Sequence, residues 1–274
     1  MRRLYPLPAP AAALPDPAAA PPGPDASTDR EWTLDELADA YAYPDESDPL
    51  RAGRPGWLRA NMVASLDGAA HHEGRSQPLS STADMRIFGV LRALADAVVV
   101  GAETVRQEGY RPARARAAFA GRRAAAGQGP APAVAVVTAG LGLDFTLPLF
   151  TEPLVPTLVV TGTGAPAERV AAARAAGVEV LFAGEGQGVD PARVPAVLAA
   201  RGHRRLLTEG GPSLLGQFAA AGVLDEMCLS LAPVVAVGDA PRIMGGPAVA
   251  VPERFALASV LEEAGFLFTR YRRS

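Results

Sequence analysis

Residues 204–218, Arg-Arg-Leu-Leu-Thr-Glu-Gly-Gly-Pro-Ser-Leu-Leu-Gly-Gln-Phe, contain the signals of a strand, a tight turn and a helix start. Leu206 and Leu207 are typical of the end of a short buried strand. Gly210-Gly211 predicts a turn that few other residues could make, because glycine tolerates positive φ angles without steric cost. Pro212 suits the first turn of a helix, where its missing N–H group costs nothing. The stretch therefore predicts a strand–turn–helix unit.

The turn of this unit is also a candidate anion-binding site. Free N–H groups and the positive end of the helix dipole meet at a helix N-terminus. Glu209 precedes the turn, and a carboxylate in such a place needs a partner or a catalytic role. The same residues also suit a plain connection between a strand and a helix, so the pattern alone leaves both interpretations open.

The composition limits the classes of protein to which the chain can belong. Its 274 residues can form one large α/β domain or two small ones, and a hydrophobic content of 49% is ample for a core. The net charge of −3 predicts no nucleic-acid partner. The 26 basic residues counted as lysine or arginine are all arginine, which excludes a lysine base, a Schiff-base lysine and a P-loop lysine.

Cysteine, histidine and apolar content exclude further classes. Cys228 is the only cysteine and lies in an apolar run, so we expect it to be buried and structural. The adjacent His71 and His72 cannot both face one metal from a regular element, so we predict no metal site. No apolar run reaches the roughly 18 residues of a membrane span, and no signal peptide is indicated. We therefore expect a cytoplasmic protein without a membrane partner.

Three regions are expected along the chain. Residues 1–30 are rich in proline and alanine and are expected to be disordered. Within residues 31–56, Thr33 and Glu36 have the spacing of a capping box for a short helix, and a polar linker follows. Residues 57–274 are expected to form a single domain.

Strands alternate with helices in this domain, which indicates an α/β fold with a mainly parallel central sheet covered on both faces. The last strand alternates apolar and polar residues and is expected to be an antiparallel edge strand. The arginine-rich residues 106–130 are expected to form a surface loop rather than a nucleic-acid-binding stripe. We expect strands at 57–66, 97–100, 133–138, 157–161, 178–182, 204–208, 226–233, 256–261 and 266–272, and helices at about 82–94, 166–176, 191–201 and after Pro212.

Three polar turns follow predicted strands, at 65–68, 101–104 and 209–213. Ligands of mainly parallel sheets bind beyond the carboxyl ends of the strands, so we expect these turns to build one shared site. Asp67 in the first turn is a candidate for stabilising positive charge or relaying a proton. A simple turn residue is the alternative interpretation.

Five motifs occur in an order that resembles a known family. They are Asn61-Met62-Val63-Ala64-Ser65-Leu66-Asp67-Gly68, Gly74-x-Ser76, Leu91-Arg92-Ala93-x-x-Asp96, Val100-Gly101-x-x-Thr104-Val105 and Thr208-Glu209-Gly210-Gly211. Over about residues 57–272 the chain resembles the reductase domain of bacterial riboflavin-biosynthesis deaminase–reductases, in a stand-alone form without the zinc deaminase domain. The resemblance implies a dihydrofolate-reductase-like three-layer αβα sandwich, NADPH as the hydride donor, and a homodimer.

The resemblance also implies a reaction. The substrate is 2,5-diamino-6-ribosylamino-pyrimidinone 5′-phosphate or its deaminated form, 5-amino-6-ribosylamino-uracil phosphate, which is reduced to the ribitylamino compound. Two alternatives stay open. One is an NADPH-dependent reductase of dihydrofolate or another pterin, and the other is a non-catalytic NADP-binding sensor or partner protein.

Matching positions imply the residues of the site. Substrate contacts are implied for Asn61, Ser76, Arg92 and Arg114, with Arg92 as a phosphate ligand because its planar fork suits phosphate oxygens. Glu209 is implied as a substrate-facing carboxylate. Asp67 and Glu209 are our two catalytic candidates. Thr138 is a candidate hydroxyl for the 2′-phosphate of the cofactor. The expected cofactor contacts are Ala64, Pro78, Gly101, Thr104, Glu108, Thr138, Gly210, Gly211, Pro212, Ser213 and Leu214.

The sequence departs from the family's pattern in three places. Asn61 stands where bifunctional members often carry a lysine. Gln77-Pro78-Leu79 replaces a tryptophan-containing motif that packs near the nicotinamide, and Glu108-Gly109-Tyr110 replaces an Asp-x-Pro stretch. These departures concern the substrate more than the cofactor.

Overall fold

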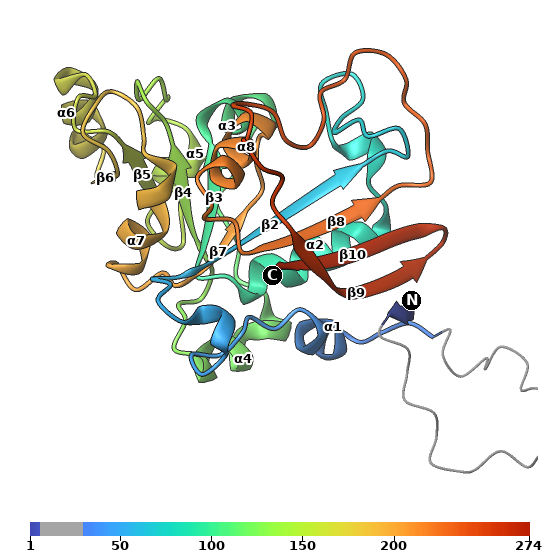
Figure 1. Cartoon of the computed structure of the whole chain (residues 1–274). Coiled ribbons are helices and arrows are strands. Elements are labelled where there is room, and N and C mark those ends of the chain that lie inside the picture. Colours follow the sequence, from blue (N-terminus) through green and yellow to red (C-terminus); the bar gives the residue numbers. More distant parts are fainter. Residues whose placement is uncertain (6–29) are drawn as a thin grey trace, which may run out of the picture.

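A ten-stranded mixed sheet runs through the part of the chain that the computed structural model describes, residues 1–5 and 30–274. The strands lie in the order β1-β9-β10-β8-β2-β7-β3-β4-β5-β6 (Figure 1). From β8 to β6 in this order the neighbours are parallel, whereas β1, β9 and β10 pair antiparallel. The predicted α/β architecture is confirmed. The strands are β1 Arg2–Tyr5, β2 Trp57–Ala64, β3 Ala97–Gly101, β4 Ala133–Val137, β5 Leu158–Thr161, β6 Glu179–Phe182, β7 Arg205–Thr208, β8 Glu226–Leu231, β9 Phe255–Glu263 and β10 Phe266–Arg273.

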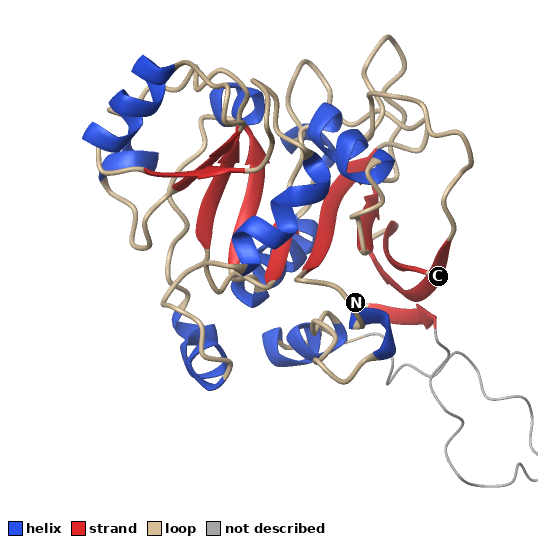
Figure 2. Cartoon of the chain, turned by 60° about the vertical axis from the view of Figure 1, so that its left-hand side comes forward, coloured by secondary structure: helices blue, strands red, loops and turns tan. Residues whose placement is uncertain are grey.

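Helices pack on both faces of the strands (Figure 2). Helices α1 and α2 share one buried cluster with the sheet, and α7 and α8 share another. Within the described ranges, none of the helices is both long enough and apolar enough to cross a membrane. The helices are α1 Leu34–Ala40, α2 Thr82–Leu94, α3 Ala102–Gln107, α4 Ala120–Ala125, α5 Pro148–Thr151, α6 Ala167–Ala175, α7 Val194–Ala199 and α8 Pro212–Ala220.

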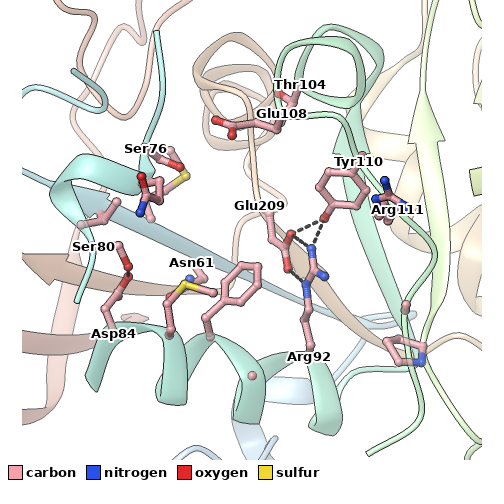
Figure 3. A pocket seen from close by; sticks show the side chains of 18 of the residues that line it. Asn61, Ser76, Ser80, Asp84, Arg92, Thr104, Glu108, Tyr110, Arg111 and Glu209 are labelled. Carbon is pink, nitrogen blue, oxygen red and sulfur yellow. Dashed lines mark hydrogen bonds and ion pairs between the residues drawn. The ribbon is translucent and has the colours of Figure 1, made fainter. Parts of the chain in front are cut away.

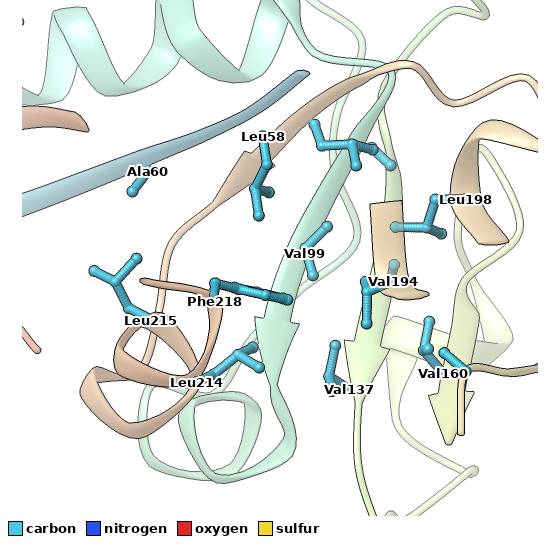
Figure 4. Packing of buried hydrophobic residues seen from close by; sticks show 14 of the residues in the cluster. Leu58, Ala60, Val99, Val137, Val160, Val194, Leu198, Leu214, Leu215 and Phe218 are labelled. Atoms are coloured by element: carbon cyan, nitrogen blue, oxygen red, sulfur yellow. The ribbon is translucent and has the colours of Figure 1, made fainter. Parts of the chain in front are cut away.

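Strand β3 illustrates why the central strands are continuously apolar. Successive side chains of a strand point to opposite faces of the sheet. Val98 therefore joins the cluster that contains Leu91 of α2, whereas Val99 joins the cluster that contains Phe218 of α8 (Figure 4). Both valines are at most 1% exposed. A strand covered on both faces has no solvent-facing position that a polar side chain could use.

The antiparallel end of the sheet corrects two predictions. Strand β10 is antiparallel as expected, but it lies between β8 and β9 and is not an edge strand. The edge is β1, which lies in the region predicted to be disordered. Its side chains are exposed, but its backbone pairs with β9 and the Met1 amino group lies 3.2 Å from Glu263. The prediction of disorder for the rest of that region, up to residue 29, lies outside the described residues.

The arginine-rich segment 106–130 corrects a third prediction. It contains helix α4, and Arg123 of that helix is 3% exposed. The Arg123 guanidinium donates hydrogen bonds to the carbonyls of Ala93, Ala95 and Gly129, at distances between 2.7 and 2.9 Å. An arginine that satisfies the last carbonyls of a helix ties the segment to the end of α2. The segment is therefore packed against the domain rather than a loose surface loop.

Helix α1 begins at the predicted capping box. The Thr33 side chain accepts a hydrogen bond from the Glu36 N–H, and the Glu36 carboxylate accepts one from the Thr33 N–H. At the other end of the helix, Arg59 of β2 donates to the Tyr41 carbonyl at 2.7 Å. Arg270 of β10 donates to the carbonyls of residues 40 and 42. Two arginines of the sheet thus hold the C-terminal end of α1.

One carboxylate balances both arginines. Glu226 of β8 is 0% exposed, and its Oε1 lies 2.7 Å from Arg59 Nε and 2.6 Å from Arg270 Nε. Burial alone would raise the pKa of Glu226, but the two arginines outweigh burial and lower it to about 2. The carboxylate therefore stays ionised, and the cluster anchors the N-terminal helix to the sheet.

Glu226→Gln is expected to destabilise the protein by about 3–5 kcal/mol, because two buried guanidinium groups lose their counter-charge. Glu179→Gln is the matched control. Glu179 pairs with Arg201 at 2.6 Å, but the side chains are 41% and 53% exposed, and surface pairs contribute about 0–1 kcal/mol. Urea unfolding measures both losses, and equal losses would contradict the anchoring role of Glu226.

Candidate functional site

A cavity of about 630 Å³ opens at the carboxyl ends of β2, β3 and β7 (Figure 3). This is the edge of the sheet at which the sequence predicts a site, and the volume is typical of small-molecule sites. Its wall combines residues of the strand ends, of α2 and of the segment after α3. The predicted site residues that line it are Asn61, Ser76, Arg92, Thr104, Glu108, Arg114, Glu209, Gly211 and Pro212.

The glycine turn after β7 meets the turn after β3. The carbonyl of Gly210 accepts a hydrogen bond from the Gly101 N–H at 3.0 Å. Gly210 has a φ of +86°, as the turn requires, whereas Gly211 has a φ of −65°. Gly211 is needed for space, because a Cβ there would lie 2.8 Å from Thr104 Oγ1. The structure thus brings two of the three predicted turns into contact.

The N-terminus of α8 begins in this turn. Gly211 is the N-cap residue and Pro212 is the first helical residue, as predicted. Within the described part of the chain, no side chain caps this end. The N–H groups of the first turn therefore remain available to an anion beside Gly211.

The turn at 65–68 has a different role. The Asp67 carboxylate accepts hydrogen bonds from the N–H groups of Ala236 and Val237 at 3.0 and 2.7 Å, and from the Ser65 hydroxyl. These bonds, the one from Ala236 first, lower the pKa of Asp67 to about 2. Asp67 is absent from the described residues that line the cavity. Its charge instead ties the turn to the loop that follows β8.

Three predicted cofactor residues, Gly101, Gly210 and Leu214, form or contact the glycine turn without lining the cavity. Gly101 and Gly210 share the backbone hydrogen bond described above. A Cβ on Gly101 would lie 3.8 Å from the Leu214 Cβ, and Leu214 is 8% exposed. These residues shape the turn, and they lie outside the set of described residues that line the cavity.

Four other predicted cofactor residues also lie outside that set, as far as the described residues show. The carbonyl of Ala64 accepts a hydrogen bond from Ala232 at 2.8 Å, and the Thr138 hydroxyl accepts one from the Leu141 N–H at 3.1 Å. Ser213 is exposed on α8. Pro78 lies in a short 3₁₀ turn whose neighbour Gln77 lines the cavity.

Arg92 and Glu209 form an ion pair in the middle of the cavity wall (Figure 3). Arg92 Nε and Nη2 donate to the two Glu209 oxygens at 2.6 Å each. The Arg92 guanidinium carbon also lies 4.4 Å from the ring centre of Phe88. Arg92 is predicted to bind phosphate, but in the structure its Nε–Nη2 edge makes a bidentate contact with Glu209.

Tyr110 completes this pair and was not among the predicted site residues. Its hydroxyl donates to Glu209 Oε2 and accepts from Arg92 Nη2 at 2.7 Å. Burial and the Glu209 charge raise the pKa of Tyr110 well above its usual value. Gly109, with a φ of +59°, makes the turn that precedes it. The departure from the family's pattern at residues 108–110 was the one sequence signal that could have identified Tyr110 as a site residue.

One end of the cavity is rich in arginine. Arg111 and Arg116 line it together with Arg114. Arg116 lies directly on α2, because a Cβ at Gly89 would come within 1.9 Å of its Nη1. The enrichment of arginine in this segment was visible in the sequence, but the prediction of a surface loop kept Arg111 and Arg116 out of the site.

The other end offers hydroxyl, amide and carboxylate groups. Asn61, Ser76, Ser80 and Asp84 lie on the opposite side of Glu209 from Arg111 (Figure 3). Asp84 accepts hydrogen bonds from Ser80 and, at 2.6 Å, from Ser230. In the described residues, no group of three or more His, Cys, Asp and Glu side chains could hold a metal ion. The cavity thus offers a basic end and a neutral-to-acidic end.

Two known proteins are similar to this chain in sequence. A relative from Archaeoglobus fulgidus, named 2,5-diamino-6-ribosylamino-4(3H)-pyrimidinone 5′-phosphate reductase, is 29% identical over 192 residues, which are 69% of this chain and 86% of the relative. A relative from Aquifex aeolicus with the same name is 31% identical over 188 residues, 66% of this chain and 79% of the relative.

Solved structures share the fold. A pyrimidine reductase-like protein from Corynebacterium diphtheriae is 27% identical with a TM-score of 0.74, covering 87% of this chain and 98% of that one. RibD of Acinetobacter baumannii is 20% identical with a TM-score of 0.63, covering 81% of this chain and 59% of that one, and supports the fold alone. The family model described as the RibD C-terminal domain matches residues 56–263, which contain the whole cavity wall. The chain belongs to the RibD C-terminal domain family.

Proposed function

We propose that this protein is an NADPH-dependent reductase of riboflavin biosynthesis. Its substrate is 2,5-diamino-6-ribosylamino-4(3H)-pyrimidinone 5′-phosphate or the deaminated 5-amino-6-ribosylamino-uracil phosphate, and its product is the ribitylamino compound. The observation that carries the proposal is the alignment with two reductases of this name over 86% and 79% of their lengths. The proposal includes a homodimer, which the family resemblance implies, and a location in the cytoplasm.

The glycine turn fits the pyrophosphate of a nicotinamide cofactor. Gly211 has no side chain to hinder a phosphate, and the first turn of α8 presents N–H groups beside it. Thr104 lies against Gly211 and adds a hydroxyl at the cavity wall. When bound, NADPH supplies the hydride, and the protein orients and encloses the reacting groups.

The two ends of the cavity suit the two ends of the substrate. Arg111, Arg114 and Arg116 offer guanidinium groups to the 5′-phosphate. Asn61 and Asp84, at the other end, offer an amide and a carboxylate to the donor-rich pyrimidine ring. The ribose then lies between them, beside Glu209. Reduction of the open imine form makes one C–H bond at C1′ from the hydride and one N–H bond from a proton.

Glu209 is the carboxylate that we assign to substrate binding at C1′. Its side chain is 6% exposed and lines the cavity, so it faces the ligand without being surrounded by solvent. Asp67 is left out of the proposed catalytic set, because its carboxylate is engaged by the loop after β8. Arg92 is assigned to Glu209 rather than to the phosphate.

The proposal is tested by following NADPH oxidation with the phosphorylated pyrimidine and, in parallel, with dihydrofolate. We expect turnover with the pyrimidine and a kcat/KM for dihydrofolate lower by at least about 100-fold, because the flat pterin offers no phosphate to the arginines. No turnover of the pyrimidine by a folded preparation would reject the assignment. A preference for dihydrofolate would move the protein to the pterin reductases.

Arg114→Ala is expected to raise KM for the phosphorylated pyrimidine about 10-fold, because a charge-assisted hydrogen bond to phosphate is lost. KM for the same pyrimidine without its 5′-phosphate serves as the internal reference and should stay nearly constant. Arg122→Ala is the matched control, since Arg122 pairs with Asp39 of α1 at 2.8 Å and is not among the described residues that line the cavity. Steady-state kinetics of both variants decide whether this end binds phosphate.

Gly211→Val is expected to abolish NADPH binding and leave the fold intact. The backbone of Gly211, with φ −65° and ψ −175°, is open to any residue. The loss therefore comes from the side chain, which fills the space beside Thr104 Oγ1. Gly140→Val is the control, because a Cβ there meets no atom of the described residues within 4 Å. Fluorescence titration with NADPH measures binding, and wild-type affinity of Gly211→Val would remove the turn from the cofactor site.

A further inference from the structure

The Tyr110 side chain has one polar group, a hydroxyl that both donates and accepts a hydrogen bond in the cavity wall. The hydroxyl donates to Glu209 Oε2 and accepts from Arg92 Nη2. Arg92 Nη2 also donates to the same Glu209 oxygen, at 2.6 Å. The three side chains therefore form a closed ring of hydrogen bonds at Glu209 Oε2, and the bond from Arg92 Nε fixes the second Glu209 oxygen.

This ring restricts the rotation of the Glu209 carboxylate. Rotation about its terminal bond would break the bonds from Arg92 and from Tyr110 together. The guanidinium itself is fixed between two rings, 4.4 Å from the Phe88 centre and 5.1 Å from the Tyr110 centre. Tyr110 thus makes two contacts: its hydroxyl donates a hydrogen bond to Glu209, and its ring packs near the Arg92 guanidinium.

The charges of the ring are balanced. The positive charge of Arg92 neutralises Glu209 in a place where their side chains are only 26% and 6% exposed. Burial would lower the pKa of Arg92, but the Glu209 charge and hydrogen bonds outweigh burial and raise it. The raised pKa of Tyr110 keeps the proton on the phenol. Glu209 is therefore presented to the cavity as a hydrogen-bond acceptor that Arg92 and Tyr110 hold in place.

We propose that Tyr110 is a positioning residue that acts through Glu209 and orients its carboxylate to accept hydrogen bonds from N–H and O–H donors of the bound ligand. The inference rests on the proposed function, in which those donors belong to the ribosylamino group. It adds to that function a residue at a position where the sequence departs from the family's pattern.

Tyr110→Phe removes the hydroxyl and keeps the ring. We expect kcat/KM for the pyrimidine to fall about 10- to 100-fold, the effect of losing one hydrogen bond to a charged group. Most of the change should appear in KM, because the carboxylate then keeps only its two bonds from Arg92 and is less firmly oriented before the substrate binds. The dissociation constant of NADPH should stay unchanged, since the hydrogen bonds of the Tyr110 hydroxyl go to Arg92 and Glu209 and not to the glycine turn.

Tyr43→Phe is the matched control for the loss of a tyrosine hydroxyl. The Tyr43 hydroxyl donates to the Leu206 carbonyl at 3.1 Å, and Tyr43 is not one of the described residues of the cavity wall. Its removal should change stability and leave KM as in the wild type. A similar rise of KM in both variants would show that Tyr110 acts only on the fold and would overturn the inference.

A double-mutant cycle with Glu209→Gln is the decisive measurement. If Tyr110 acts through Glu209, Tyr110→Phe should change kcat/KM less than about 2-fold in the Glu209→Gln background, because there is no ionised carboxylate left to orient. Additive effects of the two substitutions would overturn the inference. The cycle is run with the pyrimidine or with dihydrofolate, whichever the wild type reduces.

The same cycle in urea unfolding keeps the inference separate from the proposed function. Coupling between Tyr110→Phe and Glu209→Gln in the free energy of unfolding reports the hydrogen bond without any substrate. If the wild type reduces neither compound, the proposed function fails, and coupling in unfolding still supports the orienting bond. Absence of coupling in unfolding would overturn the inference whatever the wild type reduces.

Discussion

The contact between the ends of β3 and β7 is the constraint on which the site depends. The Gly101 N–H reaches the Gly210 carbonyl at 3.0 Å, and Gly211 lies against Thr104. Both contacts need glycine, one for a positive φ and the other for space. Strand β7 lies between β2 and β3. The contact therefore places Glu209 beside Asn61, and both residues line the cavity together with residues of α2.

Buried charge holds two parts of this molecule in place in different ways. Under α1, Glu226 is paired with Arg59 and Arg270 at 0% exposure, and the arginines extend the cluster to the helix carbonyls. In the cavity, the pair of Arg92 and Glu209 is partly open to the ligand. The first cluster stabilises the attachment of the N-terminal helix. The second presents a neutralised carboxylate at the place where the ribose is proposed to lie.

Local sequence predicted much of the fold because several signals are short-range. The capping box at Thr33, the alternation of strands with helices and the Gly-Gly-Pro turn each depend on neighbouring residues, and the structure contains all three. These local signals do not predict the order of the strands in the sheet. Strand β10 pairs with β8 on one side and with β9 on the other. Strand β1 then pairs with β9 and forms the edge, a contact between residues about 260 positions apart in the case of Arg2 and Glu262.

The amino-acid pattern was enough to assign Glu209, Gly211 and Thr104 to one edge of a parallel sheet, because the residues that end a strand and form a turn are neighbours in the chain. The partners of the side chains in this region depend on contacts that form only in the folded chain. Asp67 and Arg92 have residue types that suit catalysis and phosphate, yet one binds backbone N–H groups and the other binds Glu209. Pairing of that kind joins segments far apart in the chain, such as Tyr110 and Glu209, which are 99 positions apart, and no local pattern encodes it.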